Sequence, residues 1–359
     1  MTPFLELKPR EDAAAVHEAV DRVIARGWFV LGPELDAFER EFAAACGSPA
    51  AIGVGTGTDA IAIALRALGI GPGDEVITAP LSAAYSALAV MMTGARPVFA
   101  DIDPERLTLD PGAAAAAVTP RTAAMLPIHI YGQPADMRAL TGVAARHNLA
   151  IVEDCCQAHL ATCGGQPVGS FGAAAAYSFY PTKNLGALGD GGAITTNDRQ
   201  LAERARRLRN GGQTDRYHHG EFGVNSRLDE IQAAVLRARL AFLPQWTSRR
   251  RELASTYRAR LHGARRITVP PEVEPGHVYH LFPVRSPERA AVQSDLRTAG
   301  VETLIHYPVP ITKQPALAAQ HPSDCPVANR TCDEVFSLPL YPSLPDGTID
   351  RVVATLTSA

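Results

Sequence analysis

Short apolar segments alternate with stretches of helical periodicity between about residues 50 and 200. Apolar segments bounded by turn residues are typical of buried strands. We expect strands at residues 51–54, 75–78, 97–102, 123–130, 150–153, 174–179 and 193–196, and helices at 59–68, 82–92, 135–147 and 198–209. This alternation predicts an α/β fold with a mostly parallel central sheet flanked by helices. Ligands on such sheets bind beyond the carboxyl ends of the strands.

A further helical pattern begins near residue 226. Ser226 is a favourable N-cap, and Asp229 follows three residues later as in a capping box. Pro244 should interrupt this helix, and a second, basic helix is expected at residues 245–261.

The proline-rich stretch 267–276 is expected to be a linker. Beyond it the pattern predicts an apolar segment at residues 277–284, a helix at 287–299, a strand at 301–306 and terminal helices. We therefore predict a large domain with an N-terminal arm at residues 1–245 and a smaller C-terminal α/β domain at residues 246–359.

The composition excludes several classes of protein. The chain has 359 residues, of which 46% are hydrophobic and 20% charged, and its net charge of −3 offers no basic surface for nucleic acid or an anionic membrane. No apolar run is long enough to span a bilayer, and the first residues are too polar for a signal peptide. Six cysteines are too few for a disulfide scaffold, so we expect a cytoplasmic protein.

Lysine is scarce in this chain. Of 34 Lys and Arg residues, only Lys8, Lys183 and Lys313 are lysines. A Schiff base requires a primary amine, which a guanidinium group cannot supply. Lys183 lies in SFYPTKNLGALGDGG (178–192), among small residues where a long cation has no evident packing role. It is therefore our candidate for covalent chemistry.

Two other segments could complete a cofactor site. GTGTDA (55–60) follows an expected strand and opens an expected helix, where backbone N–H groups and the helix N-terminus favour a phosphate. It lacks the spacing of a dinucleotide or P-loop motif, so an ordinary strand–helix turn stays an equal alternative. Ser178, five residues before Lys183, could meet the same phosphate.

VEDCCQAH (152–159) ends an expected strand. Alternation should point Glu153 and Asp154 to opposite faces, so that one carboxylate reaches the sheet edge. There it could keep a pyridinium nitrogen protonated, as pyridoxal chemistry requires. An acidic pair that merely ends a strand is the alternative.

The cluster Cys155, Cys156, His159 and Cys163 raises the question of a zinc site. Neighbouring residues of a strand face opposite ways, and a paired CxxC is missing. We therefore predict no metal and expect small buried side chains.

Several motifs together resemble the nucleotide-sugar aminotransferases of the DegT type, a branch of the fold-type-I pyridoxal 5'-phosphate (PLP) enzymes with an aspartate aminotransferase-like fold. They cover nearly the whole chain: GWFVLGPELDAFEREFA (27–43), GTGTDA, ALGIGPGDEVIT (67–78), YGQPADM (131–137), VEDCCQAH, SFYPTKNLGALGDGG, GVNSRLDEIQAAVL (223–236) and IHYPVP (305–310).

The resemblance assigns roles to individual residues. It implies that Lys183 forms the Schiff base with PLP, that Asp154 pairs with the pyridine nitrogen and that Gln157 contacts the ring hydroxyl. The residues implied for the phosphate are Gly57, Thr58 and Ser178, with Asn225 reaching the neighbouring subunit's site, which makes the active unit a homodimer. The residues implied near the sugar are Tyr85, His306 and Tyr307.

The chain departs from the family pattern near the pocket mouth. Ala83 stands where a ring-stacking aromatic residue is common, with Tyr85 two places on, and Thr312 replaces a second histidine after HYPVP. The small pair after the acidic dipeptide is Cys155–Cys156, and Leu160 replaces a glycine. These differences bear on the substrate more than on the reaction.

The resemblance implies transfer of an amino group from an amino acid, glutamate in most of the family, to a keto group of a nucleotide-linked sugar, with the 3-position of a deoxy sugar preferred. Lys183 would then serve as covalent anchor and as general acid and base. The alternatives are a keto-cyclitol or 4-keto-sugar aminotransferase and a non-catalytic PLP-binding regulatory protein. A PLP-dependent dehydratase is disfavoured because that variant lacks the Schiff-base lysine.

Overall fold

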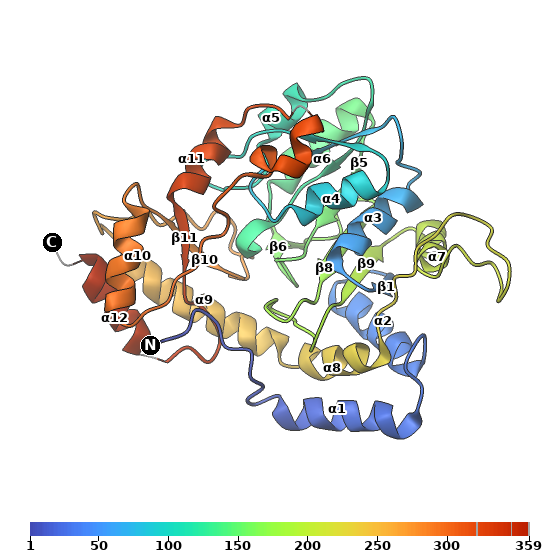
Figure 1. The fold of residues 1–359 in the computed structure, drawn as a ribbon, viewed down its shortest axis with the longest axis horizontal. Coiled ribbons are helices and arrows are strands. Elements are labelled where there is room, and N and C mark those ends of the chain that lie inside the picture. The colour runs from blue at the N-terminus through green and yellow to red at the C-terminus, as the bar shows by residue number, and fades with distance from the viewer. Residues whose placement is uncertain (321, 346, 358–359) are drawn as a thin grey trace.

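The computed structural model describes residues 1–320, 322–345 and 347–357. This part of the chain contains a seven-stranded sheet in the order β1-β9-β8-β5-β4-β2-β3 (Figure 1). Its strands are β1 (Ala50–Val54), β2 (Glu75–Thr78), β3 (Arg96–Phe99), β4 (Thr122–Leu126), β5 (Ala150–Asp154), β8 (Ala174–Ser178) and β9 (Gly192–Thr196). β9 pairs antiparallel with β1 and β8, whereas the other pairs are parallel. The prediction of a mostly parallel sheet is confirmed.

All seven expected strands are present, but β3 and β4 end earlier than expected. Beyond β3, Ile102 forms a single bridge with Leu109. Beyond β4, Ile128 forms a single bridge with Asp154, and the chain then coils into a short 3-10 turn at Ile130–Gly132. Ile102, Ile128 and Ile130 are buried although they have left the sheet ladder, which accounts for the apolar pattern that predicted longer strands.

Helices cover both faces of the sheet. Alternate residues of β8 enter separate cores: Ala174 and Ala176 pack on the side of α3 (Gly57–Ala67) and α7 (Arg199–Leu208), whereas Tyr177 packs on the opposite side. That opposite side is covered by α2 (Pro33–Ala45), α5 (Pro111–Ala116) and α6 (Met137–His147). Two other helices of this part are α1 (Ala13–Arg26) and α4 (Tyr85–Met92). The expected helices at 59–68, 82–92, 135–147 and 198–209 are thus confirmed, with shifted ends.

The prediction that Ser226 caps a helix is wrong. α8 (Glu230–Leu240) begins four residues later, after Asp229. Ser226 Oγ instead accepts a hydrogen bond from the N–H of Gly55 (2.9 Å) and donates one to Asp59 Oδ2 (2.7 Å). These distant partners attach the segment before α8 to the β1–α3 turn.

The C-terminal part has a core and a sheet of its own. α9 (Leu243–Arg260) contains Pro244 in its first turn, where the missing N–H costs no helical hydrogen bond. β10 (Phe282–Arg285) pairs antiparallel with β11 (Val335–Leu338). The helices around them are α10 (Arg289–Thr298), α11 (Pro326–Glu334) and α12 (Gly347–Thr357), with the short 3-10 turns Ile311–Lys313, labelled η2, and Pro315–Gln320, labelled η3. The remaining pair of strands, β6 (Thr162–Cys163) and β7 (Gln166–Pro167), forms a small hairpin after β5.

The strand expected at residues 301–306 does not form. Val301 makes a single bridge with Thr2, and Leu304 makes one with Ser337. Because the partners change from the N-terminal arm to β11 within three residues, no continuous ladder can build up. The segment then continues toward His306.

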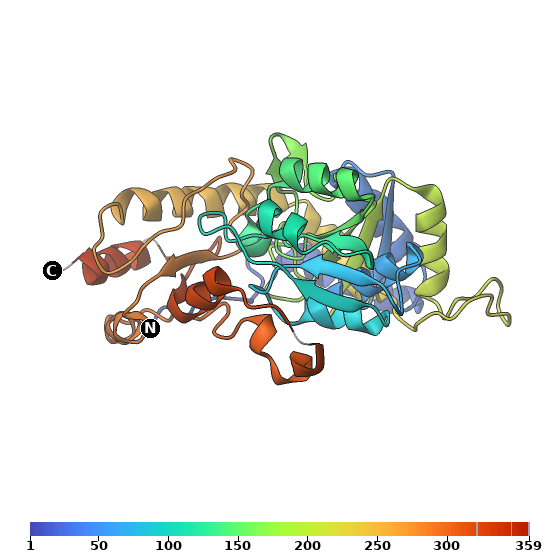
Figure 2. The same ribbon diagram turned by 90° about the horizontal axis from the view of Figure 1, so that it is seen from above.

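Figure 1 and Figure 2 show α9 running from the large sheet toward the part that carries β10 and β11. The N-terminal arm also meets that part, through the N–H of Thr2 on the Gly300 carbonyl (2.8 Å) and the N–H of Phe4 on Glu302 (2.9 Å). α9 continues through residue 245, so the division into 1–245 and 246–359 stays a prediction, and residues 321, 346, 358 and 359 lie outside the described part. None of the described helices combines the length and apolar composition needed to cross a bilayer.

A buried carboxylate joins α8 to α2, and it gives a test of this fold. Glu230 is fully buried and accepts hydrogen bonds from the N–H groups of Gly32 (3.0 Å), Glu34 (2.9 Å) and Leu35 (2.9 Å) at the start of α2. Glu230→Ala should lower the free energy of unfolding by about 2–4 kcal/mol, because buried N–H groups lose a charged acceptor. Urea unfolding measures the loss. Glu41→Gln, which removes an exposed partner of Arg237, is the control and should cost less than about 0.5 kcal/mol; equal losses would contradict the role of Glu230.

Candidate active site

A cavity of about 610 Å³ opens beyond the carboxyl ends of the parallel strands. Its walls come from the β1–α3 turn, the β2–α4 loop, the ends of β5 and β8, the 180–190 loop and the C-terminal part of the chain. The site-forming segments therefore meet where the strand order of an α/β sheet places a ligand.

The β1–α3 turn presents the N-terminus of α3 to this cavity. Thr56 caps the helix by accepting from the N–H of Asp59 (3.0 Å), and Gly57 and Thr58 line the cavity with Ser178. A Cβ on Gly57 would lie 2.7 Å from the Ser178 Cβ and 2.9 Å from the Cys156 Sγ. Only glycine leaves room here, and the helix N-terminus with two hydroxyls suits a phosphate.

The two carboxylates at the end of β5 face opposite ways, as predicted. Asp154 lines the cavity, is 4% exposed, and accepts from Ser86 Oγ (2.7 Å) and the N–H of Cys156 (3.1 Å). Glu153 is fully buried on the other side and accepts from backbone N–H groups of the 169–172 loop. Asp154 is thus available to a ligand, and Glu153 is structural.

Gln157 has a fixed amide orientation. Its Oε1 accepts from the N–H of Tyr131 (2.7 Å), a residue held at φ 60°, and its Nε2 donates to the hydroxyl of Tyr307 (3.2 Å). The second hydrogen of Nε2 therefore remains to donate into the cavity.

Lys183 lines the same cavity and is half-buried. Desolvation lowers the pKa of its amine, while Cys156 and Asp154 act in the opposite direction. Within the described part of the chain no hydrogen bond of the Lys183 side chain is found, so the amine is free to react. Lys8 and Lys313 are exposed and lie outside this cavity.

The residues predicted near a sugar also reach the cavity. His306 bonds through Nδ1 to Ser337 Oγ (3.0 Å), and burial together with the charge of Lys183 lowers its pKa to about 4. Burial raises the pKa of Tyr307 to about 12. Tyr85 is 65% exposed at the start of α4 and lies at the rim beside Ala83.

Asn225 differs from the other predicted site residues. It is exposed and does not line the cavity of its own chain. Its backbone pairs with that of Asn210, next to Ser226 and the β1–α3 turn. Its role in a neighbouring subunit stays a prediction.

Several cavity residues were not identified from the sequence. The most informative are Ser86, which orients Asp154, and His280, which comes from the C-terminal part. Tyr180, Thr182 and Asp190 also line the cavity. Proximity to the Lys183 motif could have indicated the last three, whereas nothing local marks Ser86 or His280.

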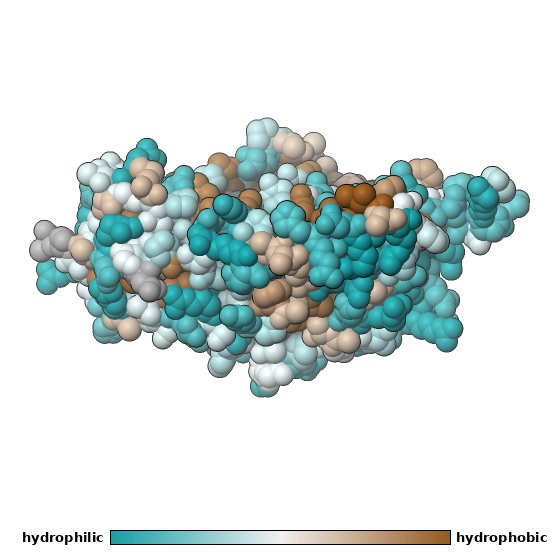
Figure 3. All heavy atoms as spheres, turned by 90° about the horizontal axis from the view of Figure 1, so that it is seen from below, coloured by the Kyte–Doolittle hydropathy of each residue, from teal (hydrophilic) through white to brown (hydrophobic). Residues whose placement is uncertain are grey.

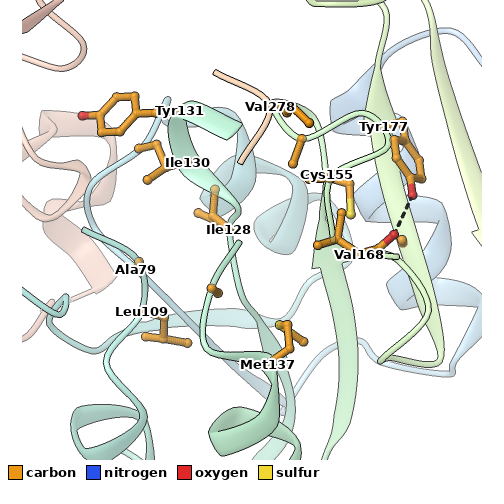
Figure 4. Packing of buried hydrophobic residues seen from close by; sticks show 14 of the residues in the cluster. Ala79, Leu109, Ile128, Ile130, Tyr131, Met137, Cys155, Val168, Tyr177 and Val278 are labelled. Carbon is orange, nitrogen blue, oxygen red and sulfur yellow. Dashed lines mark hydrogen bonds between the residues drawn. The ribbon is translucent and has the colours of Figure 1, made fainter. Parts of the chain in front are cut away.

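The cysteine cluster divides between the core and the cavity. Cys155 packs beside Val168 and Tyr177, whose hydroxyl donates to the Val168 carbonyl at 3.3 Å (Figure 4). Cys163 is also in the core, and burial lowers the pKa of His159 to about 3. Cys156, by contrast, lines the cavity, so the expectation that all these side chains are buried packing residues is wrong for Cys156.

One buried group, His129, Glu153 and Cys155, has ligand-type atoms within 4.8 Å of one another. Glu153 accepts three backbone N–H groups, and His129 accepts from the N–H of Ala135 through Nδ1 (3.0 Å) and meets Glu153 through Nε2 (3.2 Å). These contacts already use the carboxylate of Glu153 and both ring nitrogens of His129.

Comparison with known proteins matches this chain to a family. The model of the DegT/DnrJ/EryC1/StrS aminotransferase family matches residues 10–357. The chain is 49% identical to dTDP-3-amino-3,4,6-trideoxy-alpha-D-glucose transaminase of Streptomyces venezuelae, over 98% of this chain and 94% of that protein. It is 48% identical to the erythromycin biosynthesis sensory transduction protein EryC1 of Saccharopolyspora erythraea, over 99% of this chain and 98% of that protein.

The fold agrees with that of a solved structure of similar sequence. The crystal structure of S. venezuelae DesV in complex with a ketimine intermediate superposes with a TM-score of 0.96 at 48% identity, covering 99% of this chain and 97% of that one. The expected fold-type-I architecture is confirmed. The chain belongs to the DegT/DnrJ/EryC1/StrS aminotransferase family.

Proposed function

We propose that this protein is a PLP-dependent aminotransferase that moves an amino group from glutamate to a keto group of a nucleotide-linked sugar. The observation that carries the proposal is the meeting of three groups in one 610 Å³ cavity: the Lys183 amine, the Asp154 carboxylate and the α3 N-terminus. These are the amine, ring partner and phosphate cradle that PLP requires. The family membership and the transaminase name of the 49% identical relative support it.

The residues present fit PLP. Gly57 leaves space for a phosphate beside Thr58 and Ser178, and Asp154 and Gln157 offer an acceptor and a donor to a ring nitrogen and a ring hydroxyl. When bound, PLP supplies a reactive aldehyde and an electron sink.

The chain's own residues would hold and move protons. Asp154, oriented by Ser86 and the N–H of Cys156, would keep a proton on the ring nitrogen, since an opposite charge nearby favours the charged form. Lys183, with its lowered pKa, would anchor the cofactor covalently and, once released, carry a proton between the two carbons that exchange nitrogen.

The active unit we propose is a homodimer in which Asn225 reaches the neighbouring site. Asn225 is exposed in the single chain, and so is an apolar stretch after α1, with Trp28 at 54%, Phe29 at 49% and Val30 at 39%. Figure 3, which views the molecule from below, shows apolar areas between hydrophilic ones. Three consecutive exposed apolar side chains, two of them large aromatic ones, favour a protein–protein interface at this place.

The substrate we propose is a 3-keto deoxy sugar, in line with the name of the Streptomyces relative. A 4-keto sugar and a keto-cyclitol are the alternatives within the fold. The sensory transduction name of the 48% identical relative favours a second candidate, a PLP-binding regulatory protein without turnover. Cytoplasmic location, predicted from the cysteine content, is part of the same proposal.

Replacing Lys183, the proposed Schiff-base lysine, tests whether this cavity binds PLP covalently. Purified protein with PLP should show the visible absorbance of lysine-bound cofactor, and Lys183→Ala should abolish it because no other cavity amine is available among the described residues. Lys313→Ala removes an exposed lysine outside the cavity and should keep the full absorbance. Absorbance that persists in Lys183→Ala would show that Lys183 has been misassigned.

Addition of glutamate separates turnover from regulation. We expect glutamate to bleach the visible band of the wild-type protein and to release one equivalent of 2-oxoglutarate, because the first half of a ping-pong transamination needs no sugar. Stopped-flow absorbance and mass spectrometry measure the two events. A band that no amino donor changes would support the regulatory candidate.

Mixed dimers test the role of Asn225. Lys183→Ala and Asn225→Ala homodimers should each have little activity, whereas refolded mixtures should regain up to about a quarter of the wild-type activity, because each mixed dimer holds one intact site. Steady-state transamination of the mixture measures the recovery. If Asn225 acts within its own chain, the mixture gains nothing over its parents.

A further inference from the structure

His280 is a cavity residue that belongs to the C-terminal part of the chain. Residues 278–281 run beside the 3-10 turn after β4, with the N–H of Val278 on the Gly132 carbonyl (3.1 Å) and the N–H of Leu281 on the Tyr131 carbonyl (3.3 Å). Gly132, at φ 91°, permits this approach, since a Cβ there would lie 2.9 Å from the backbone nitrogen of His280. This contact places His280, 7% exposed, in the wall shared with Lys183.

The tautomer of His280 is fixed by Asn184, the residue after Lys183. Asn184 is 4% exposed and donates through Nδ2 to the carbonyl of Val278 (3.1 Å). Its Oδ1 therefore faces His280 and accepts from the ring nitrogen Nδ1 (3.2 Å). With the proton on Nδ1, the other nitrogen, Nε2, has a free lone pair.

Nε2 is the polar atom that His280 offers to the cavity. Over the described residues Nε2 has no hydrogen-bond partner, and it is not among the fully buried atoms that lack one. Burial and the charge of Lys183, with Arg250 and the imidazoles of His306 and His159, lower the pKa of His280 well below its ordinary value. The ring thus stays neutral and can only accept a hydrogen bond at Nε2.

A hydrogen-bond acceptor at His280 Nε2 suits the keto sugar better than the amino donor. The amino donor carries a carboxylate on its reacting carbon, and an acceptor nitrogen gains nothing from it. A keto sugar carries hydroxyl donors on the carbons beside its keto group. That keto carbon must come within reach of Lys183, which lines the same cavity as His280 and whose charge acts on the His280 ring. A hydroxyl on a neighbouring carbon would therefore enter the part of the cavity that His280 lines.

We propose that His280 Nε2 accepts a hydrogen bond from a hydroxyl on a carbon adjacent to the keto carbon of the sugar, so that His280 selects sugars that keep this hydroxyl. The inference rests on the proposed function and adds a specificity-determining residue to it. It also assigns His280 to the sugar half-reaction alone.

Two substitutions separate substrate contact from structure. His280→Asn can keep the donor to Asn184 but has no acceptor at the place of Nε2. His280→Gln offers an acceptor oxygen near Nε2 and gives up the bond to Asn184. The aminated cofactor form of each variant is mixed with a nucleotide-linked 3-keto sugar and with its 2-deoxy and 4-deoxy analogues, and kcat/KM is measured for each.

The wild-type enzyme should use one of the two analogues about 10–100-fold less well than the parent sugar. His280→Asn should lower kcat/KM for the parent sugar by about the same factor and for the poor analogue less than about 3-fold, whereas His280→Gln should stay within about 5-fold of wild type. The glutamate half-reaction should change less than about 3-fold in both variants.

Three results would overturn the inference in favour of a structural role for His280. The first is an equal loss of kcat/KM on all three sugars, and the second is a higher kcat/KM in His280→Asn than in His280→Gln. The third is a loss of the same size in the glutamate half-reaction. A wild-type enzyme that does not discriminate among the three sugars overturns it without any variant, even if the variants fail to fold. Failure of the proposed function has a different signature, since the wild-type protein would then not respond to glutamate.

Discussion

At the end of β5 the N–H of Asp154 donates to the Pro127 carbonyl (2.9 Å), and the Asp154 carbonyl accepts from the N–H of His129 (3.1 Å). These two bonds fix the strand end whose side chain enters the cavity. The same segment continues to Tyr131, whose N–H holds Gln157 (2.7 Å). One short stretch of backbone therefore positions both the carboxylate and the amide that a cofactor ring would meet. Other parts of the site depend on it because β5 lies between β4 and β8, the strands that lead to this stretch and to Lys183.

The adjacent carboxylates at this strand end serve different purposes because the strand alternates. Glu153 is surrounded by backbone N–H groups of the 169–172 loop and by His129, so it stabilises the loop that leads into β8. Asp154 has one hydroxyl and one backbone N–H as partners and keeps lone pairs for a ligand. A buried carboxylate is tolerated only where hydrogen-bond donors surround it. Glu153 has donors on both of its oxygens, whereas Asp154 has one donor on each oxygen and can accept more.

The cavity also depends on the C-terminal part of the chain. His280, His306 and Tyr307 come from that part. His280 is placed by the backbone contacts of residues 278–281 with Tyr131 and Gly132, and the hydroxyl of Tyr307 accepts from Gln157. The hydroxyl of Tyr131 adds a bond to the His306 carbonyl. The groups that hold a cofactor and those that would read a substrate are thus joined by one packed segment, and packing of this kind transmits small displacements because close-packed interiors do not deform freely.

Sequence periodicity alone determined the seven strands, the helices α3, α4, α6 and α7, and the opposite directions of Glu153 and Asp154, because these properties depend on neighbours in the chain. It did not predict α5, a short helix between β3 and β4. It also indicated Lys183, since a scarce amine in a segment of small residues is a local signal. Tertiary structure decided that Ser226 binds the β1–α3 turn and does not cap a helix, that residues 301–306 form no strand, and that Ser86 and His280 reach the cavity. In each of these cases the deciding partner lies far away in the sequence, and a hydrogen bond between distant segments leaves no periodic trace in either of them.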